Sequence, residues 1–371
     1  MKSFYKIFFL FFITTSVCSA THLLGGEIRA TNLSGLTYRI SARVYFDAQN
    51  GNAAANAQTS IDICFGDGNT GSAKRVSYDL LSGDSKGLAV GIYETTYTYP
   101  TTGLFQISSS IANRSQGILN YTANSEAPMF LWTVINTQFA NETPLMPYPI
   151  YTSGVKQILK IDFQPAATDS DSISAHLQKL SVASPGTCGV RMIDNQYSFP
   201  NDVSKAGTFF IDKIEKKLVW NAPDAIGKYL YAMVIDEWRN GIKISETYRE
   251  GIIVIVDKPG PTVEIPPYVP ATTSGVITAN PDANYAELTL ALDAYPVPTS
   301  DYLNVKVTSK YATTFNVQLI SLEGRIIREL KTTAPDVEWI NQMDLRQISS
   351  GLYILKATDE TGKVVTRKIV R

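Results

Sequence analysis

The chain has 371 residues, of which 33 are basic and 34 acidic, and its net charge at neutral pH is −1. This balance gives no positive field for nucleic acid and no polybasic patch for anionic lipid, so both partner classes are excluded. We expect two or three domains at this length. The 20 tyrosines suit the half-buried faces of β-sheets.

The N-terminus has the three parts of a secretory signal peptide. Lys2 and Lys6 give a basic start, residues 7–13 form a short apolar core, and small residues lead to a cleavage site between Ala20 and Thr21. Cleavage there, which defines residues 1–20 as the signal, would leave 31 basic and 34 acidic residues and a net charge of −3. We therefore expect an exported protein.

Two alternatives for this segment are a membrane anchor and a lipid anchor. The apolar run is too short to cross a bilayer, which needs roughly 20 apolar residues, and no later segment of the sequence comes close. Lipidation at Cys18 would call for a small preceding residue, and Val17 is larger than that.

Two of the three cysteines, Cys64 and Cys188, remain after removal of the signal. An oxidising compartment would allow them to form one disulfide. Two separate buried thiols are the alternative, because a disulfide would have to connect two predicted domains.

Alternation of apolar and polar residues predicts β-strands in the first third of the exported chain, and helical periodicity is almost absent. Short strands with regular turns between them are typical of a β-sandwich. The expected strands cover residues 38–46, 60–65, 93–99 and 105–111.

A turn of Phe65, Gly66, Asp67 and Gly68 ends the second of these strands, and its glycines tolerate a positive φ. Downstream follow the segments Tyr97-Thr98-Tyr99-Pro100 and Gly103-Leu104-Phe105-Gln106-Ile107. This arrangement resembles the polycystic-kidney-disease (PKD) type of immunoglobulin-like repeat, which has an FGDG turn followed by a pair of strands. The segments 22–28 and 113–120 are similar to the N-terminal region of Bacteroidetes surface proteins. The resemblance implies a PKD-like or Ig-like domain over residues 21–143.

A second β domain is expected over residues 144–257. Its strands are expected at residues 158–163, 209–212, 217–220, 229–236 and 251–256. The order of its motifs resembles cadherin-like or Ig-like bacterial repeats, in which a DxD pair precedes a strand and a GxYxxxVxxxD strand closes the sandwich. Asp169 and Asp171 match the first motif, and Gly227, Tyr229 and Asp236 match the second.

Asp169, Asp171 and Asp236 are candidate calcium ligands. The first two lie two residues apart in a loop, and the third would join them across the end of the sandwich. Calcium takes six to eight oxygen ligands, and the sequence shows only part of such a set. A solvated acidic turn is the alternative, and we expect no other cofactor.

The only enzyme-like motif is GxSxG at residues 83–87, with Ser85 in the nucleophile position. That chemistry needs a strand before the serine and a helix after it, and the flanks here are short and not helical. His176 lies in a different predicted domain, and no metal-binding or phosphate-binding motif is present. We predict a polar hairpin loop at this position and no catalytic residues.

Six prolines mark residues 258–286 as a semi-rigid linker. The C-terminal segment after it, residues 287–371, alternates as a small β-sandwich with hairpin turns. Its strands are expected at residues 288–292, 302–308, 315–321, 325–330, 352–358 and 364–370.

The start of this segment carries a spaced motif of Tyr295, Pro296, Pro298, Asp301 and Leu303. It resembles the YPNPxxDxLxI opening of the type IX secretion (Por) C-terminal sorting domain, type A, with Val297 in place of the usual Asn. Gly324 in a hairpin, and Gly351 with Tyr353 in a later strand, agree with the same family. An ordinary C-terminal Ig-like domain is the alternative.

The resemblance implies a route and partners. The chain would cross the outer membrane through the type IX translocon, a sortase-like protease would remove the C-terminal domain, and the rest would be surface-attached or extracellular. Three functions stay open: an adhesin-like or structural surface protein, a carbohydrate-binding accessory protein, or a secreted hydrolase with Ser85. Trp132, Trp220 and Trp238 are the candidates for a sugar platform, with burial in the sandwich as the alternative for each.

Overall fold

The computed structural model describes residues 23–49, 51–81, 87–123, 127–163, 171–212, 217–239, 242–271, 275–277 and 290–371. Strands dominate these ranges, and the helices within them are the short α1 (Asn52–Ala57) and η2 (Pro200–Asp202). The fold is all-β, as the alternation predicts. None of the described helices is long and apolar enough to cross a membrane.

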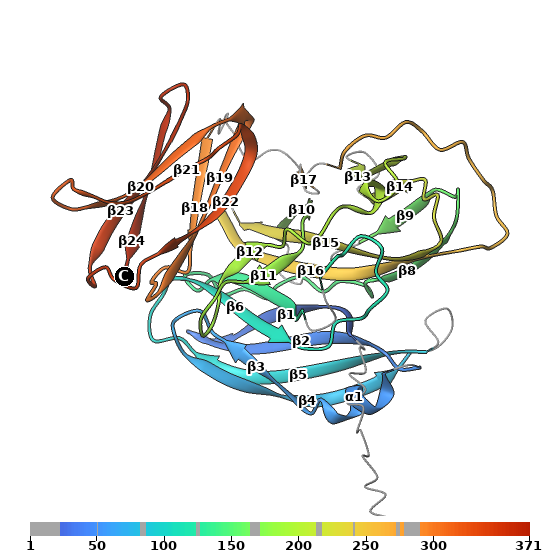
Figure 1. Cartoon of the computed structure of the whole chain (residues 1–371). Coiled ribbons are helices and arrows are strands. Elements are labelled where there is room, and N and C mark those ends of the chain that lie inside the picture. The colour runs from blue at the N-terminus through green and yellow to red at the C-terminus, as the bar shows by residue number, and fades with distance from the viewer. Residues whose placement is uncertain are drawn as a thin grey trace, which may run out of the picture.

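The described residues from 23 to 277, here called the body, are organised around one large sheet (Figure 1). Its first part follows the order β1-β2-β5-β4-β3. The sheet continues through β6 and β7, which lie on the other side of a shared core. The bounds are β1 (Leu23–Ser34), β2 (Thr37–Asp47), β3 (Ser60–Cys64), β4 (Thr70–Leu80), β5 (Leu88–Thr98), β6 (Leu104–Ile111) and β7 (Met129–Asn136).

The same sheet then takes in strands from the second half of the body. β7 pairs with β16, which pairs with β15, and the path ends at β10 and β17. β16 also pairs with β1 and, in parallel, with β8, so the path of hydrogen-bonded strands closes on itself. The bounds are β8 (Ile150–Gly154), β10 (Ser172–Gln178), β15 (Gly227–Arg239), β16 (Ile242–Val256) and β17 (Gly275–Ile277).

The contact of β1 with β16 depends on two glycines. A Cβ atom on Gly25 would lie 2.4 Å from the carbonyl oxygen of Glu250, and one on Gly26 would lie 2.7 Å from the carbonyl oxygen of Arg43. No real side chain is tolerated at such distances, so the Gly-Gly pair lets three strands approach. The sequence boundary expected between residues 143 and 144 therefore does not separate two sheets. The segments 21–143 and 144–257 share one, which corrects the picture of two independent sandwiches.

Two small sheets complete the body. One has the order β13-β14-β9, and the other is the hairpin β11-β12, which lies near the C-terminal domain. The bounds are β9 (Leu159–Asp162), β11 (Ser181–Ala183), β12 (Arg191–Ile193), β13 (Thr208–Asp212) and β14 (Lys217–Asn221).

Residues 290–371, here called the C-terminal domain, form a two-layer sandwich with a core of its own. One layer has the order β18-β19-β22, and the other β21-β20-β23-β24. Alternate residues of β19, such as Leu303, Val305 and Val307, are fully buried between the layers. The bounds are β18 (Leu290–Tyr295), β19 (Tyr302–Thr313), β20 (Phe315–Ser321), β21 (Ile326–Lys331), β22 (Asp336–Asp344), β23 (Leu352–Asp359) and β24 (Val364–Val370).

The structure describes residues 258–271 and 275–277 of the proline-rich segment; the first stretch is joined to the rest of the body by hydrogen bonds, and the second forms β17, which pairs with β10 (Figure 1). The amide of Val263 donates to the Lys156 carbonyl at 2.8 Å, and the amide of Gly207 donates to the Pro266 carbonyl at 3.0 Å. Residues 258–271 are thus hydrogen-bonded to the rest of the body, whereas the composition alone predicts an extended, semi-rigid spacer.

Cys64 and Cys188 form a disulfide, with their Cα atoms 5.4 Å apart. Cys64 ends β3, and Cys188 lies in the turn between β11 and β12. The sequence placed the two cysteines in different predicted domains, but in the structure both segments belong to the body, so a disulfide between them is possible. Of the two alternatives that the sequence leaves open, the disulfide is the one found.

We predict that replacing both cysteines with serine lowers the free energy of unfolding by about 2–5 kcal/mol. The disulfide joins residues separated by 124 positions, so its loss frees a long loop in the unfolded chain. Urea unfolding of the purified protein measures the effect. Reducing agent should destabilise the wild type to the same extent and leave the double variant unchanged. A wild type indifferent to reducing agent would contradict the prediction.

Candidate functional site at the junction of the body and the C-terminal domain

The first strand of the C-terminal domain has two different faces. Leu290, Leu292 and Ala294 of β18 point into the domain's own core. The alternating residues Asp293 and Tyr295 face the body instead, where Tyr295 belongs to the body's core cluster and is 3% exposed. Because side chains alternate along a strand, one short strand serves both cores.

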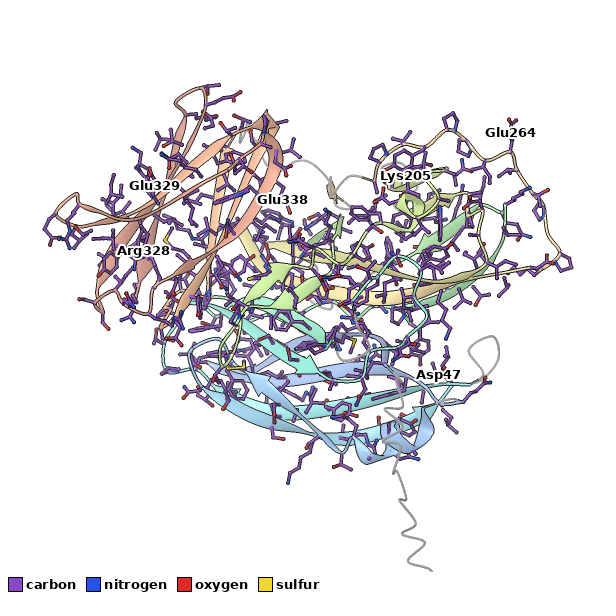
Figure 2. All side chains as sticks on the ribbon, viewed as in Figure 1. Asp47, Lys205, Glu264, Arg328, Glu329 and Glu338 are labelled. Carbon is purple, nitrogen blue, oxygen red and sulfur yellow. A yellow bond between two sulfur atoms is a disulfide. The ribbon has the colours of Figure 1, made fainter. Side chains whose placement is uncertain are left out.

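The outer face of the whole β18-β19-β22 sheet continues this contact. Residues paired across an antiparallel sheet share a face, so Asn304 lies beside Tyr295 and Lys306 beside Asp293. Asn304 is fully buried and Lys306 is 8% exposed. Figure 2 labels Glu338 of β22 on the side of the domain next to the body, and Arg328 and Glu329 on the other layer. The sheet is therefore covered on both faces along β18 and the middle of β19, whereas Asp344 at the end of β22 is exposed.

A buried arginine lies at the centre of the junction. The Arg191 guanidinium carbon is 3.7 Å from the ring centre of Trp132 and 3.9 Å from that of Tyr295, so the cation is held between two aromatic rings. Its Nη2 lies 2.7 Å from a carboxylate oxygen of Glu246, and both side chains are almost fully buried. Trp132 and Glu246 belong to the body and Tyr295 to the C-terminal domain, so the stack joins the two parts.

Lys243 forms a second ionic link across the junction. Its Nζ lies 3.4 Å from Asp293 of the C-terminal domain and 3.7 Å from Asp236 of the body, and it also contacts Glu246. Burial alone would lower the pKa of Lys243, but the three carboxylates raise it above its usual value. Lys243 therefore stays charged, and Asp293 is also paired with Arg367 of its own domain at 2.8 Å.

Backbone and amide hydrogen bonds complete the contact. The amide of Leu104 donates to the carbonyl of Val297 and the amide of Val297 donates to the carbonyl of Leu104, both at 2.9 Å. The Asn304 side-chain amide donates to the Gln106 carbonyl oxygen at 3.2 Å. The start of β6 is thus paired with the Pro296–Pro298 segment of the C-terminal domain, which fixes the register between the two parts.

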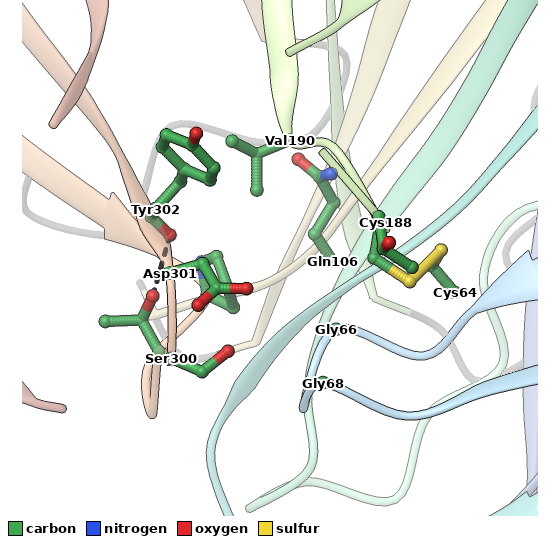
Figure 3. Close-up of a pocket in the computed structure, with 12 residues that line it drawn as sticks. Cys64, Gly66, Gly68, Gln106, Cys188, Val190, Ser300, Asp301 and Tyr302 are labelled. Atoms are coloured by element: carbon green, nitrogen blue, oxygen red, sulfur yellow. Dashed lines mark hydrogen bonds between the residues drawn. A yellow bond between two sulfur atoms is a disulfide. The ribbon is translucent and has the colours of Figure 1, made fainter. Parts of the chain in front are cut away.

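Two cavities border these contacts. The smaller, about 120 Å³, has the Cys64–Cys188 disulfide on one wall and Ser300 and Asp301 on the opposite wall (Figure 3). The larger, about 300 Å³, is lined by Trp238, Lys243 and Asp293, among others. Both cavities are composite, since each needs residues from the body and from the C-terminal domain.

The motif residues of the C-terminal segment divide between folding and docking. Tyr295 and Pro296 lie at the junction, and Asp301 lines the smaller cavity. Leu303 and Tyr353 lie in the domain's core. The other motif residues occupy turns or strand ends: Pro298 packs near Gly103, Gly324 has a φ of +82° in its hairpin, and the amide of Gly351 donates to the Arg371 carbonyl.

The turn after β3 has the geometry that its glycines allow. Gly66 and Gly68 have φ values of +87° and +93°. Phe65 stacks on Tyr97 with 3.8 Å between ring centres, and the Tyr97 hydroxyl donates to Asp67 at 2.6 Å. The hydroxyl and the ring thus tie the turn to β5. The PKD resemblance itself stays a prediction.

Two of the three candidate calcium ligands, Asp171 and Asp236, are described by the structure, and both have other partners. Asp171 accepts two hydrogen bonds from Arg239, at 2.8 and 2.6 Å, and Asp236 is paired with His176 and Lys243. Asp169 lies outside the described residues, as do Ala20, Thr21 and Ser85. In the described ranges, no group of three or more acidic, histidine or cysteine side chains is placed to hold a metal ion.

No sequence signal pointed to Arg191, Lys243 or Glu246. Lys243 and Glu246 are three residues apart on β16, and only the tertiary fold brings Arg191 of β12 to them. The sorting motif singles out Tyr295, but it does not predict that the Tyr295 ring packs on the Arg191 guanidinium.

We predict that the protein loses stability as the pH falls, and that Glu246 carries much of this loss. Burial would raise the pKa of Glu246, but Arg191 and Lys243 hold it well below the ordinary value of 4.5. The carboxylate therefore binds fewer protons in the folded than in the unfolded state. Its contribution is fully present above about pH 4.5 and is lost as the pH falls through the lower, folded pKa.

The Glu246→Gln variant tests this prediction in urea unfolding between pH 3 and pH 7, a range chosen to bracket carboxylate titration. At neutral pH it should be less stable by about 3 kcal/mol, because Arg191 is left buried without its counter-charge. Its pH dependence should be flatter than that of the wild type. The control is Asp344→Asn, which removes an exposed carboxylate paired with Arg346 and should leave the stability almost unchanged. Parallel curves for Glu246→Gln and wild type would contradict the assignment.

Comparison with known proteins gives a family match for the C-terminal domain. Residues 293–371 match the family model of the secretion system C-terminal sorting domain. A search of curated proteins finds no match for the chain. The match covers the second half of β18 through β24, so the type IX sorting prediction for this segment is confirmed. A sorting domain of this type indicates export to the cell surface or the extracellular space, and interaction with the type IX secretion machinery.

Proposed function

We propose that this chain is cargo of the type IX system and that its body acts outside the cell as a non-catalytic protein of adhesin-like or structural type. The observation that carries the proposal is the C-terminal sandwich, which matches the sorting-domain model and has a hydrophobic core of its own. A domain with its own core can fold independently of its cargo, as an export signal requires.

Two further features support a location outside the cytoplasm. The N-terminus is predicted to be a signal peptide. The Cys64–Cys188 disulfide suits an oxidising compartment, because cytosolic thiols are kept reduced. Removal of the sorting domain by a sortase-like protease, and attachment to lipopolysaccharide, belong to the same proposal.

The non-catalytic part of the proposal is supported by the sequence. The chain has two histidines, and its one enzyme-like motif lacks the expected strand and helix around Ser85. A body built around the closed path β1-β2-β5-β4-β3-β6-β7-β16 suits a load-bearing or display role, since each strand of that path has a paired neighbour on both sides. A hydrolase screen of the purified protein, with Ser85→Ala as the control, addresses the alternative directly.

Carbohydrate binding is the second candidate function, and the exposure of the three tryptophans decides which of them could contact a sugar. Trp132 and Trp220 are at most 2% exposed, so neither offers a ring face to a sugar. Trp238 is only partly buried and lines the larger junction cavity beside Asn136, an arrangement of aromatic ring and amide that suits a sugar. If this candidate is right, glycan-array binding by the wild type should fall at least tenfold in Trp238→Ala.

We predict that a chain lacking residues 293–371 stays inside a bacterium with a functional type IX system, whereas the full chain reaches the surface. Leu303→Asp should behave like the truncation, because a charge in the sorting domain's core prevents its folding. Gln318→Ala is the matched control, since Gln318 lies on the outer layer of the same domain and only pairs with exposed Glu329. Antibody labelling of intact cells and mass spectrometry of the recovered C-terminus measure export and cleavage. Equal surface labelling of all four proteins would refute the sorting role.

A further inference from the structure

Export through a sorting domain requires only that the domain fold and be accessible. The structure shows more than this, because the body covers the outer face of β18 and of the middle of β19. Tyr295, Asn304 and Lys306 lie on the outer face of that layer, and each is at most 8% exposed. A domain attached only through a linker would leave this face in water, so the cover requires its own explanation.

The two surfaces are complementary in charge. On the body, Arg191 and Lys243 are the cations and Glu246 the carboxylate that face the domain. On the domain, Asp293 pairs with Lys243, and Lys306 helps to keep the pKa of Glu246 low. Opposite charges thus meet in both directions, which favours one docked orientation over others.

The contact also has an aromatic anchor and a backbone register. Tyr295 enters the body's core cluster and covers the face of Arg191 that Trp132 leaves open. Leu104 and Val297 exchange two backbone hydrogen bonds, as an added strand does at a sheet edge. A buried aromatic residue with a desolvated arginine is the composition of an interface hot spot.

We propose that the body contains a binding site for the sorting domain, and that the domain stays bound there after the chain is cut between residues 277 and 290. The occupant is the sorting domain of this chain, held by Asp293, Tyr295 and Asn304. The proposal rests on the proposed function only in supposing that a protease separates the two parts. It means that cutting and release are separate events.

The test uses the full chain with a site-specific protease sequence inserted between residues 278 and 289. After cutting, the two fragments should elute together in size-exclusion chromatography at micromolar concentration. Tyr295→Ala should raise the dissociation constant of the cut pair at least tenfold, because it removes the anchor and uncovers Arg191. Asp293→Asn should raise it severalfold, because it removes the partner of Lys243.

The matched control is Asp344→Asn on β22. Asp344 is also a carboxylate paired with an arginine, but it is exposed and its partner is Arg346 of the same domain. It should leave the dissociation constant unchanged. The proposal would be overturned if the two fragments of the cut wild-type chain eluted separately at micromolar concentration. It would also be overturned if Asp293→Asn and Asp344→Asn gave the same dissociation constant.

Circular dichroism of each variant before cutting shows whether it is folded, and Asp293→Asn carries the test should Tyr295→Ala not fold. The measurement needs no secretion machinery. A failure of co-elution therefore leaves the export role standing, whereas a failure of export in cells would leave the interface standing.

Discussion

The contact between the body and the sorting domain depends on the buried guanidinium of Arg191. A buried cation is costly unless its surroundings replace the water it has lost. In the described structure its Nε and Nη1 have no hydrogen-bond partner, so Glu246 and the rings of Trp132 and Tyr295 supply the compensation. Three of these four residues belong to the body and the fourth to the sorting domain. The surroundings of this buried cation are therefore completed by the docked domain.

Local alternation in the sequence accounts for most of the strands and for the faces that they bury. The pattern from Tyr38 to Phe46 places alternate residues in the core, as the structure shows for β2, although Tyr45 on the opposite face is buried as well. β22 was missed because its residues do not alternate between buried and exposed. Met343 is its one buried residue, and the exposed residues Val337 and Asn341 lie on the same face as Met343, so no apolar face alternates with a polar one.

Long-range pairing could not be predicted in the same way. The backbone of β1 meets that of β16 at Gly26 and Glu250, and no local pattern connects positions so far apart. The Gly25-Gly26 pair is a trace of this contact, but close backbone approach is only one of several reasons for a glycine in a strand. Arg191, Lys243 and Glu246 show the same limit, because a charged residue in a strand resembles an ordinary surface position until its neighbours in the fold are known.

The alternation of β18 and β19 has a consequence for how the sorting motif should be interpreted. Leu303 and Val305 bury themselves in the domain, whereas Asn304 and Lys306 between them face the body. Neighbouring residues of one strand therefore have different roles. Leu303 and Val305 stabilise the fold of the domain, whereas Asn304 and Lys306 serve its docking to the body. The sorting motif draws on residues of both kinds, because it includes Leu303 in the domain's core and Tyr295 against the body, whereas Asp293, Asn304 and Lys306 lie outside the motif. The docking residues Asp293, Asn304 and Lys306 are matched to this particular body, so transfer of the domain to another cargo should preserve its fold while losing its partner surface.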